Sequence, residues 1–413
     1  MILATFANPR RHEDQVFEIV ERKGAGHPDT LADAVAEAIS RAYCNYCIEQ
    51  FGAVLHHNTD KTALLGGSAH VTFGEGHMTS PMLAIVNGRM STTFGTQAIP
   101  VGEIVELATR DCLTSVLPLV DRERDIAIRS RISEAPSPGL VSNGADDAEG
   151  GRLHWFAPRG LEDLSELKRL RSNDTSCGAG YAPLTMAELL TLEIERRING
   201  LEFKSAAPQF GSDVKVMVCR KDRAIHMTTC VPQIARHTPS LRAYLEQKQE
   251  MLEQLCSWSE EICEGAAQIT VDINTRDNEA IPELYLTATG SSLESGDEGV
   301  VGRGNRANGL ISVLRPMSME GAAGKNPIYH IGKLYNLIAQ DSASRLYQAT
   351  GRATSVCLVS QSGRPLKDPW FAAVEQSGSE PVDRVAAERF IAEAMDDLPR
   401  IQSDLFAGEC VLF

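Results

Sequence analysis

GDEGVVGRGNRANGLISVLRPMSMEGAAGKNPIYHIGKLYN, residues 296–336, is the stretch around which the rest of the chain is organised. It combines repeated glycines with several basic side chains. Repeated glycine lets backbone N–H groups approach a ligand closely, and clustered cations match a polyanion. The stretch therefore predicts a polyphosphate site; the alternative is a glycine-rich surface loop with solvated charges. Its basic residues are Arg303, Arg306, Arg315, Lys325 and Lys333.

Two familiar phosphate-binding motifs fit this stretch poorly. Residues 302–307 read GxGxxA, but the dinucleotide fingerprint needs a preceding apolar strand, and here Gly-Asp-Glu-Gly opens the stretch instead. Gly324-Lys325 resembles part of a P-loop, yet Asn326 stands where that motif has Ser or Thr. We therefore expect phosphate binding by another architecture.

The composition bounds the class of protein. With 413 residues, the chain is expected to form two or three domains. Its net charge of −15 argues against a non-specific nucleic-acid partner, because such proteins are usually basic. No segment is apolar enough for a signal peptide or a membrane span, so we expect a cytoplasmic protein with no membrane partner.

The cysteine pattern predicts neither a zinc site nor disulfides. Cys44 and Cys47 form a CxxC inside a helical pattern, but a second CxxC or CxxH is missing. We interpret them as core or helix-face thiols, which fits a reducing compartment.

A glycine-led turn before a long helix is the second informative feature. Residues 16–23 alternate as a half-buried strand would, and residues 24–52 read GAGHPDTLADAVAEAISRAYCNYCIEQFG. Asp29 or Thr30 is expected to cap the helix. His27 and Asp29 would then lie at a helix N-terminus, which favours anions, and Asp29 could hold a divalent metal completed by phosphate oxygens. The alternative is that Asp29 is only a cap and His27 only a turn residue.

Strand and helix patterns alternate irregularly along the rest of the chain, which predicts an α+β fold rather than a regular βαβ series. Residues 133–160 are rich in Pro, Gly, Ser and Asp and predict a loop or linker. Helices are predicted near 101–119 and at 186–199, 240–264, 332–350 and 383–398, and strands within 53–73, 208–219, 268–274, 283–289 and 355–363.

The polar turns together supply what displacement or transfer of a polyphosphate requires: acids for metals, cations for phosphates and one histidine. Besides the 296–336 stretch, these turns are 26–29, 58–61, Asp174 with its neighbouring glycines, and Asp213 with Lys215.

The turns lie in blocks that resemble methionine adenosyltransferase (the S-adenosylmethionine synthetase family), and specifically its archaeal-type branch. The blocks span nearly the whole chain in order. They are ERKGAGHPDTLADAVAEAISRA, FGAVLHHNTDK, LLGG, NDTSCGAGYAPLT, SDVKVMV, TGSSLESGDEGVVGRGNRANGLISVLRPMSMEGAAGKNP and HIGKLYN.

The resemblance implies three similar α+β domains interleaved in sequence: residues 1–22 with 172–295, 23–140 with 296–335, and 141–171 with 336–413. It implies active sites between two subunits of a homodimer or a dimer of dimers, with ATP and methionine or a related thioether as substrates. The sulfur would attack C5′ of ATP to give S-adenosylmethionine, and the released triphosphate would be cleaved to phosphate and diphosphate. The family uses Mg²⁺ and a monovalent cation, usually K⁺.

The resemblance also assigns roles to individual residues. His27 matches a histidine that assists departure of the bridging oxygen, and Asp29 matches a magnesium ligand. Lys215, Arg303 and Lys325 match triphosphate-binding cations, and with His27 they make up the expected catalytic set. The residues expected to bind ATP or the second substrate are Asp60, Lys61, Asp174, Asp213, Asp297, Asn305, Arg306, Asn326, Tyr329, His330 and Lys333.

The nucleophile side departs from the family pattern. Where the archaeal-type branch reads close to IGQGSMDLV, this chain reads ISEAPSPGLV at 132–141, with Glu134 near the place of a neutral glutamine. Tyr329 replaces an asparagine, and Ser68 stands where Gln or His is common. We therefore expect ordinary ATP binding but altered handling of methionine, through a raised KM or another preferred thioether; the alternative is a drifted lid with methionine held by other groups.

Two further functions stay open on the sequence alone. One is an enzyme that keeps ATP and its triphosphate departure but uses a different nucleophile. The other is a weakly active, ATP-binding regulatory subunit. Retention of the expected catalytic set argues against the second, because a subunit freed from chemistry has no physical need for those residues.

Overall fold

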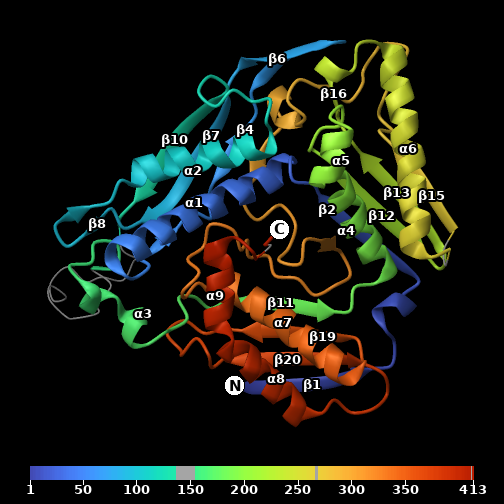
Figure 1. Ribbon diagram of the computed structural model, residues 1–413. Coiled ribbons are helices and arrows are strands. Elements are labelled where there is room, and N and C mark those ends of the chain that lie inside the picture. The colour runs from blue at the N-terminus through green and yellow to red at the C-terminus, as the bar shows by residue number, and fades with distance from the viewer. Residues whose placement is uncertain (136–153, 266–267, 411) are drawn as a thin grey trace.

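Three sheets, each packed against helices, surround a central region of loops in the computed structural model (Figure 1). The structure describes residues 1–135, 154–265, 268–410 and 412–413. Each sheet has its own hydrophobic core. The expected α+β architecture is therefore confirmed.

The first sheet takes strands from both ends of the chain. Its strand order is β1, β20, β19, β11, with β1 parallel to β20 and the other pairs antiparallel. Leu3, Leu358 and Val374 pack in its core against Ile338 and Ile391 of the covering helices. The elements are β1 (Ile2–Asn8), β20 (Phe371–Ser377), β19 (Thr354–Val359), β11 (Cys177–Ala182), α7 (Ile331–Thr350), α8 (Arg384–Asp396) and α9 (Leu398–Ala407).

The second sheet is covered by the two helices α1 and α2. Its order is β10, β7, β4, β17, with β3 also paired to β7. The elements are β10 (Ile126–Ser133), β7 (Met82–Met90), β4 (Ala63–Leu65), β17 (Gly299–Val300), β3 (His57–Asn58), α1 (Pro28–Phe51) and α2 (Val101–Val116). Short hairpins extend from it: β5 (Ser68–Thr72) with β6 (Glu75–Ser80), and β8 (Thr93–Phe94) with β9 (Gln97–Ala98).

The third sheet has the order β15, β13, β12, β2, β18 and packs against α4 and α6. Its elements are β15 (Gln268–Ile273), β13 (Ala224–Cys230), β12 (Lys215–Lys221), β2 (Phe17–Lys23), β18 (Ile311–Ser312), α4 (Met186–Asn199) and α6 (Leu241–Cys263). Smaller elements are α3 (Ser165–Lys168), α5 (Leu201–Ala206) and the pair β14 (Gln233–Ile234) with β16 (Leu286–Thr287).

The sheet pairing divides the chain differently from the expected ranges. Strand β1 was expected to belong with 172–295, but it pairs with β20 near the C-terminus. Strand β11 was expected in the same domain and pairs with β19 instead. The helix cap also differs: His27, not Asp29 or Thr30, is the N-cap of α1, because Pro28 already occupies the first helical position.

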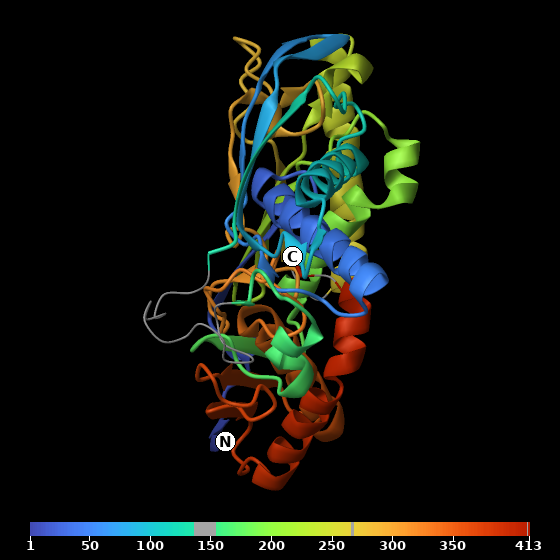
Figure 2. The same cartoon turned by 90° about the vertical axis from the view of Figure 1, so that its left-hand side faces the viewer.

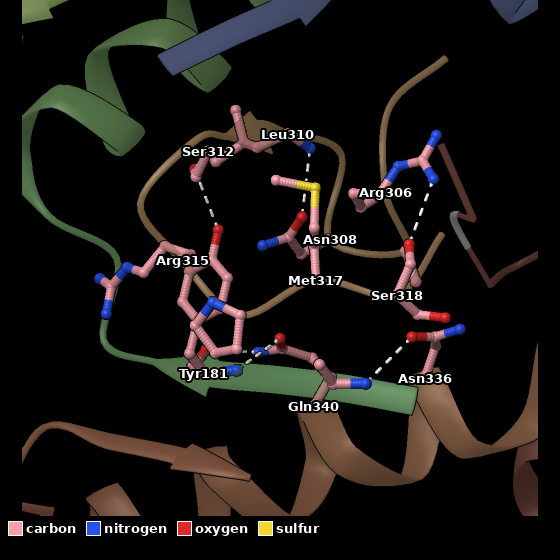
Figure 3. Close-up of a pocket in the computed structure, with 13 residues that line it drawn as sticks. Tyr181, Arg306, Asn308, Leu310, Ser312, Arg315, Met317, Ser318, Asn336 and Gln340 are labelled. Carbon is pink, nitrogen blue, oxygen red and sulfur yellow. Dashed lines mark hydrogen bonds between the residues drawn. The ribbon is translucent and has the colours of Figure 1, made fainter. Parts of the chain in front are cut away.

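The glycine-rich stretch connects all three sheets. It supplies β17 to the second sheet and β18 to the third, and then leads into α7 on the first. At the junction in Figure 3, Tyr181 of β11 donates its hydroxyl to Ser312 Oγ of β18 at 3.1 Å, while Gln340 of α7 bonds the Tyr181 backbone. The Arg315 guanidinium lies 4.2 Å from the centre of the Tyr181 ring. The cavity here is only about 20 Å³, so it is a packing junction with room for a water and not a ligand site.

The sheets are not covered on both faces. In the side view the long helices lie towards one side of the molecule and many of the strands towards the other (Figure 2). On β1 the side chain of Leu3 is buried under helices, whereas Ile2 and Phe6 point the other way and are 58% and 51% exposed. Phe17 of β2 is likewise exposed. Exposed apolar side chains on open strands mark a surface that another molecule can cover.

Candidate functional site

The turn before α1 places His27 at the wall of a pocket of about 660 Å³. Its Nδ1 accepts the backbone N–H of Asp29 at 3.2 Å, so its proton resides on Nε2. Burial, with a contribution from Lys23, lowers the pKa of His27 below 6.5, so the ring is neutral at pH 7. The turn needs glycine: a Cβ on Gly26 would lie 2.6 Å from the carbonyl carbon of Ser212. The turn therefore presents a neutral imidazole whose Nε2–H is available as a donor.

The same pocket brings three other expected residues to His27: Asp213, Lys215 and Asp297. Asp213 is almost fully buried, and its Oδ2 accepts from the backbone N–H of Ser292 at 2.8 Å. Burial raises the pKa of Asp213. The nearby His27 and the hydrogen bonds from Ser292 lower it, but they only partly offset the effect of burial. Lys215, the first residue of β12, is 40% exposed at its side chain and lies 3.1 Å from Glu21. The pocket thus offers a neutral donor, a half-exposed cation and carboxylates.

Asp29 is buried just behind this pocket and already has partners. Its Oδ2 lies 2.8 Å from Lys23 Nζ, and its Oδ1 accepts the backbone N–H of Val300 at 3.0 Å. Burial alone would raise the pKa of Asp29, but these two hydrogen bonds outweigh it and the pKa is lowered. Asp29 is therefore ionised at neutral pH. In the described part of the chain no three His, Cys, Asp or Glu side chains cluster as a metal site.

A second and larger pocket, of about 1020 Å³, gathers another group of expected residues: Asp60, Lys61, Tyr329 and His330. Lys325 lies beside it, because its Nζ pairs with Asp60 Oδ2 at 2.9 Å. Lys325 is 2% exposed and is also held by Glu320 at 2.9 Å and the Gly321 carbonyl at 2.7 Å. This pocket is formed by β3, β7 and residues around 155–173, 329–330 and 362–363.

The two pockets are separate within one chain. They share no lining residue. His27 caps the first turn of α1, whereas the Lys325 carbonyl lies 3.5 Å from Ser40 Oγ. Thirteen residues of helix at 1.5 Å each put these positions roughly 20 Å apart along α1. Within one chain the structure therefore places His27 and Lys215 in one pocket and Lys325 beside the other.

Several expected substrate ligands are used inside the protein instead. The Asn305 side chain bonds the backbone of Lys23 at 2.9 and 2.8 Å, and Asn326 bonds the Leu55 carbonyl at 3.0 Å. Lys333 is fully buried against Glu37 at 2.8 Å. These contacts favour structural roles, because each polar group is already satisfied away from both pockets.

Three more expected residues lie outside the two pockets. The guanidinium of Arg306 donates to the carbonyls of Gly302 and Gly304, which shapes the glycine loop. Arg303 is exposed next to the Asp29 region, where its carbonyl accepts from Lys23 Nζ at 2.8 Å. Asp174 is exposed and bonds its neighbour's backbone; the adjacent Asn173 lines the larger pocket in its place.

The altered segment is only partly described. Glu134 lies at the end of β10 and accepts a hydrogen bond from Thr92 Oγ1. Pro136 and Pro138, on which the expectation of a changed nucleophile pocket partly rested, lie outside the described residues. Ser68 is an exposed residue of β5.

Sequence reasoning missed the most unusual wall of the larger pocket. His56, Trp155 and Glu166 line it together with Tyr329. Trp155 lies within the loop-like stretch 133–160 and Glu166 follows it, and this composition gave no signal of a site. Only the folded chain brings them to one pocket wall.

Comparisons with known proteins agree over nearly the full length. The family model described as S-adenosylmethionine synthetase (AdoMet synthetase) matches residues 2–142 and 158–409. The chain is similar to S-adenosylmethionine synthase of Hyperthermus butylicus, at 37% identity over 97% of this chain and 96% of the relative. It is also similar to that of Aeropyrum pernix, at 39% identity over 91% and 88%.

A solved structure supports the same fold. The structure titled "Structure of an Unusual S-adenosylmethionine synthetase from Campylobacter jejuni" aligns with a TM-score of 0.56 and 13% identity, covering 96% of this chain and 94% of that one.

Proposed function

Because this chain belongs to the S-adenosylmethionine synthetase family, we propose that it transfers the adenosyl group of ATP to the sulfur of methionine. The sulfur attacks C5′, and the whole triphosphate leaves from that carbon. The observation that carries the proposal beyond family membership is the neutral His27 imidazole, which presents an Nε2–H in a pocket with Lys215.

Adenosyl transfer to a thioether requires that the reactants be positioned and that the developing charges be stabilised. A thioether has no proton to lose, so no general base is needed, and sulfur becomes cationic as negative charge grows on the leaving triphosphate. His27 Nε2–H is suited to donate to the bridging oxygen as the C5′–O bond breaks. Lys215 and Arg303 have exposed or half-exposed side chains that can move onto a triphosphate. Lys325 adds charge once it exchanges its present carboxylate partners.

The residues around Asp29 fit Mg²⁺ only together with ATP. Mg²⁺ is usually held by one or two protein carboxylates plus phosphate oxygens and waters, and one buried, ionised carboxylate is what the turn offers. Lys23 Nζ lies 2.8 Å from that carboxylate, so Mg²⁺ would have to share the carboxylate with this lysine or displace it. Bound Mg²⁺ would neutralise charge on the triphosphate. K⁺ is proposed on the family resemblance, and no described residue is assigned to it.

We also propose that two copies of the chain complete the active sites. His27 lines one pocket and Lys325 lies beside the other, the two pockets share no lining residue, and strands such as β1 and β2 leave apolar side chains exposed. A second copy that covers these strands would bring the His27 pocket of one chain to the Lys325 pocket of the other. The same open surface would then account for both the assembly and the chemistry.

A cytoplasmic location is proposed from the thiols. All ten cysteines are free, as is usual in a reducing compartment. No helix in the described part of the chain is long and apolar enough to cross a bilayer.

The function is tested by incubating the protein with ATP, Mg²⁺, K⁺ and a panel of thioethers, followed by mass spectrometry. We expect S-adenosylmethionine with methionine, together with phosphate and diphosphate. The altered nucleophile side supports a second candidate, a different thioether, and that candidate would be favoured if another member of the panel reacts with a higher kcat/KM. ATP binding without any adenosyl product would contradict both and favour a regulatory subunit.

A further inference from the structure

The β5–β6 hairpin carries two histidines directly opposite each other. His70 of β5 and His77 of β6 are register partners in an antiparallel pair, so their side chains emerge on the same face of the hairpin. The centroids of their rings lie 5.5 Å apart, and the ring planes meet at 47°. Both residues are exposed. Two imidazoles are therefore held next to each other in contact with solvent.

This pair lies apart from both large pockets. Neither histidine lines either pocket, and in Figure 1 strand β6 lies at the top of the molecule. The proposed adenosyl transfer therefore gives the pair no role.

The backbone that carries the two histidines is fixed by the rest of the protein. In the turn between the strands, the Gly74 N–H donates to the carbonyls of Ala235 and Thr238, each at 3.0 Å. A Cβ on Gly76 would lie 2.8 Å from Cβ of Ala288, so the face of the hairpin opposite the histidines packs closely against that residue. The strands keep their register, and only side-chain torsions have to be ordered when a ligand binds the two rings.

The spacing of the rings matches two imidazoles on one metal ion. A Zn–N bond of about 2.0–2.1 Å puts the centre of each imidazole about 3.2 Å from the metal. At a tetrahedral angle, two such ring centres are about 5.2 Å apart. The observed 5.5 Å differs by a few tenths of an ångström, which small rotations of exposed side chains remove.

Glu75 favours a cation at this place. It lies on the same face as His77, and its Oε1 is 3.9 Å from His77 Nδ1. A carboxylate on the Nδ1 side stabilises a proton there and leaves Nε2 to bind a metal, as is common for histidine ligands. The net charge of −15 adds a general attraction for cations.

We propose that His70 and His77 form a binding site for a divalent transition-metal ion, with their ring nitrogens as the protein ligands. In the described residues no three His, Cys, Asp or Glu side chains gather as ligands, so water completes the coordination. Imidazole suits Zn²⁺, Ni²⁺ and Cu²⁺, whereas Mg²⁺ prefers oxygen ligands. The site is thus distinct from the Mg²⁺ proposed beside Asp29, and a bound ion would link the two strands of the hairpin.

The test is a calorimetric titration of the whole chain with Zn²⁺ in excess Mg²⁺, which occupies sites made of oxygen ligands. His77→Gln should weaken binding at this site at least about 10- to 100-fold, because even an outer partner of a ligating histidine is worth that much. His226→Gln is the matched control, since His226 is exposed on β13 and lines neither large pocket. It should bind Zn²⁺ as the wild type does. Zn²⁺ held by exposed thiols would persist in every variant, so the comparison isolates the histidine pair.

The position of the ion gives an independent readout. Anomalous diffraction from zinc-soaked wild-type crystals should place one ion between His70 and His77, and the double variant His70→Gln/His77→Gln should lose it. Lowering the pH should weaken binding, because protons compete for the ring nitrogens. Equal Zn²⁺ affinity in the wild type, His77→Gln and the double variant would overturn the proposal. If the variants do not fold, the wild type alone decides: no zinc between the two rings would refute the site.

Discussion

Replacing Lys325 with Met removes the most buried of the proposed triphosphate cations. Its Nζ holds Asp60 and Glu320, each at 2.9 Å, and the residue is 2% exposed. Breaking a buried pair by removing one partner typically costs 3–5 kcal/mol. Here Lys61 remains 2.8 Å from Asp60, and Glu320 is 37% exposed, so we expect the lower end, about 3 kcal/mol. A domain of ordinary stability stays folded after such a loss.

The catalytic loss should be distinct from this destabilisation. Removing one preorganised charge-stabilising group lowers kcat by about 10²- to 10³-fold, so Lys325→Met should lose at least about a hundredfold at saturating ATP. Arg315→Met is the matched control, because Arg315 forms a buried pair with Glu188 at 2.8 Å but lines neither large pocket. It should cost at least as much unfolding free energy in urea, because it leaves Glu188 fully buried without a cation, while kcat changes only a few-fold. Turnover of Lys325→Met equal to that of Arg315→Met would refute the assignment of Lys325 to the triphosphate.

Three further predictions follow from the same geometry. His27→Asn should keep the fold and the KM for ATP, because Asn also caps helices. Its kcat should fall about a hundredfold. If ATP binding and rate fell equally, His27 would be only a turn residue. Mixing His27→Asn chains with Lys325→Met chains should restore activity to about one quarter of the wild type, because half of the exchanged dimers are mixed and each has one intact site; a monomeric mass by light scattering would end this idea. Burial lowers the pKa of His57 to about 3, so from pH 6.5 downwards the unfolded chain binds a proton that the folded chain does not, and stability falls as pH falls. His57→Gln should reduce the mean slope of unfolding free energy between pH 6.5 and 5 by about 1.1 kcal/mol per pH unit, and an unchanged slope in urea titrations would contradict the buried neutral state.

Local features of the fold were predictable because their causes are local. Helix α6 begins where expected, since Ser240 accepts the N–H of Ala243, and α1 ends at Gly52 in the left-handed conformation. Strand β1 was missed because its partner β20 lies at the other end of the chain. The expected strand at 283–289 shortens to β16, Leu286–Thr287, because only the two-residue strand β14 pairs with it. Pairing between strands that are far apart in the chain cannot be recognised from the local sequence of either strand alone.

Site residues that lie in a recognisable sequence motif were predictable. Roles that depend on tertiary packing were not. The turn around His27 could be read from its glycines and the following helix. The structural use of Asn305 and Lys333 could not, because their partners, Lys23 and Glu37, become neighbours only when the sheets assemble.

The central claim is that the methionine sulfur displaces triphosphate at C5′, so that the oxygen between C5′ and the α-phosphorus leaves with the triphosphate. It is tested most directly with ATP that carries ¹⁸O in the bridge between C5′ and the α-phosphorus, under single-turnover conditions with methionine. Mass spectrometry should find the label in the released phosphate and diphosphate and none in the adenosyl product. Label retained in the nucleoside product would mean that the bond to phosphorus breaks instead, and it would contradict the account.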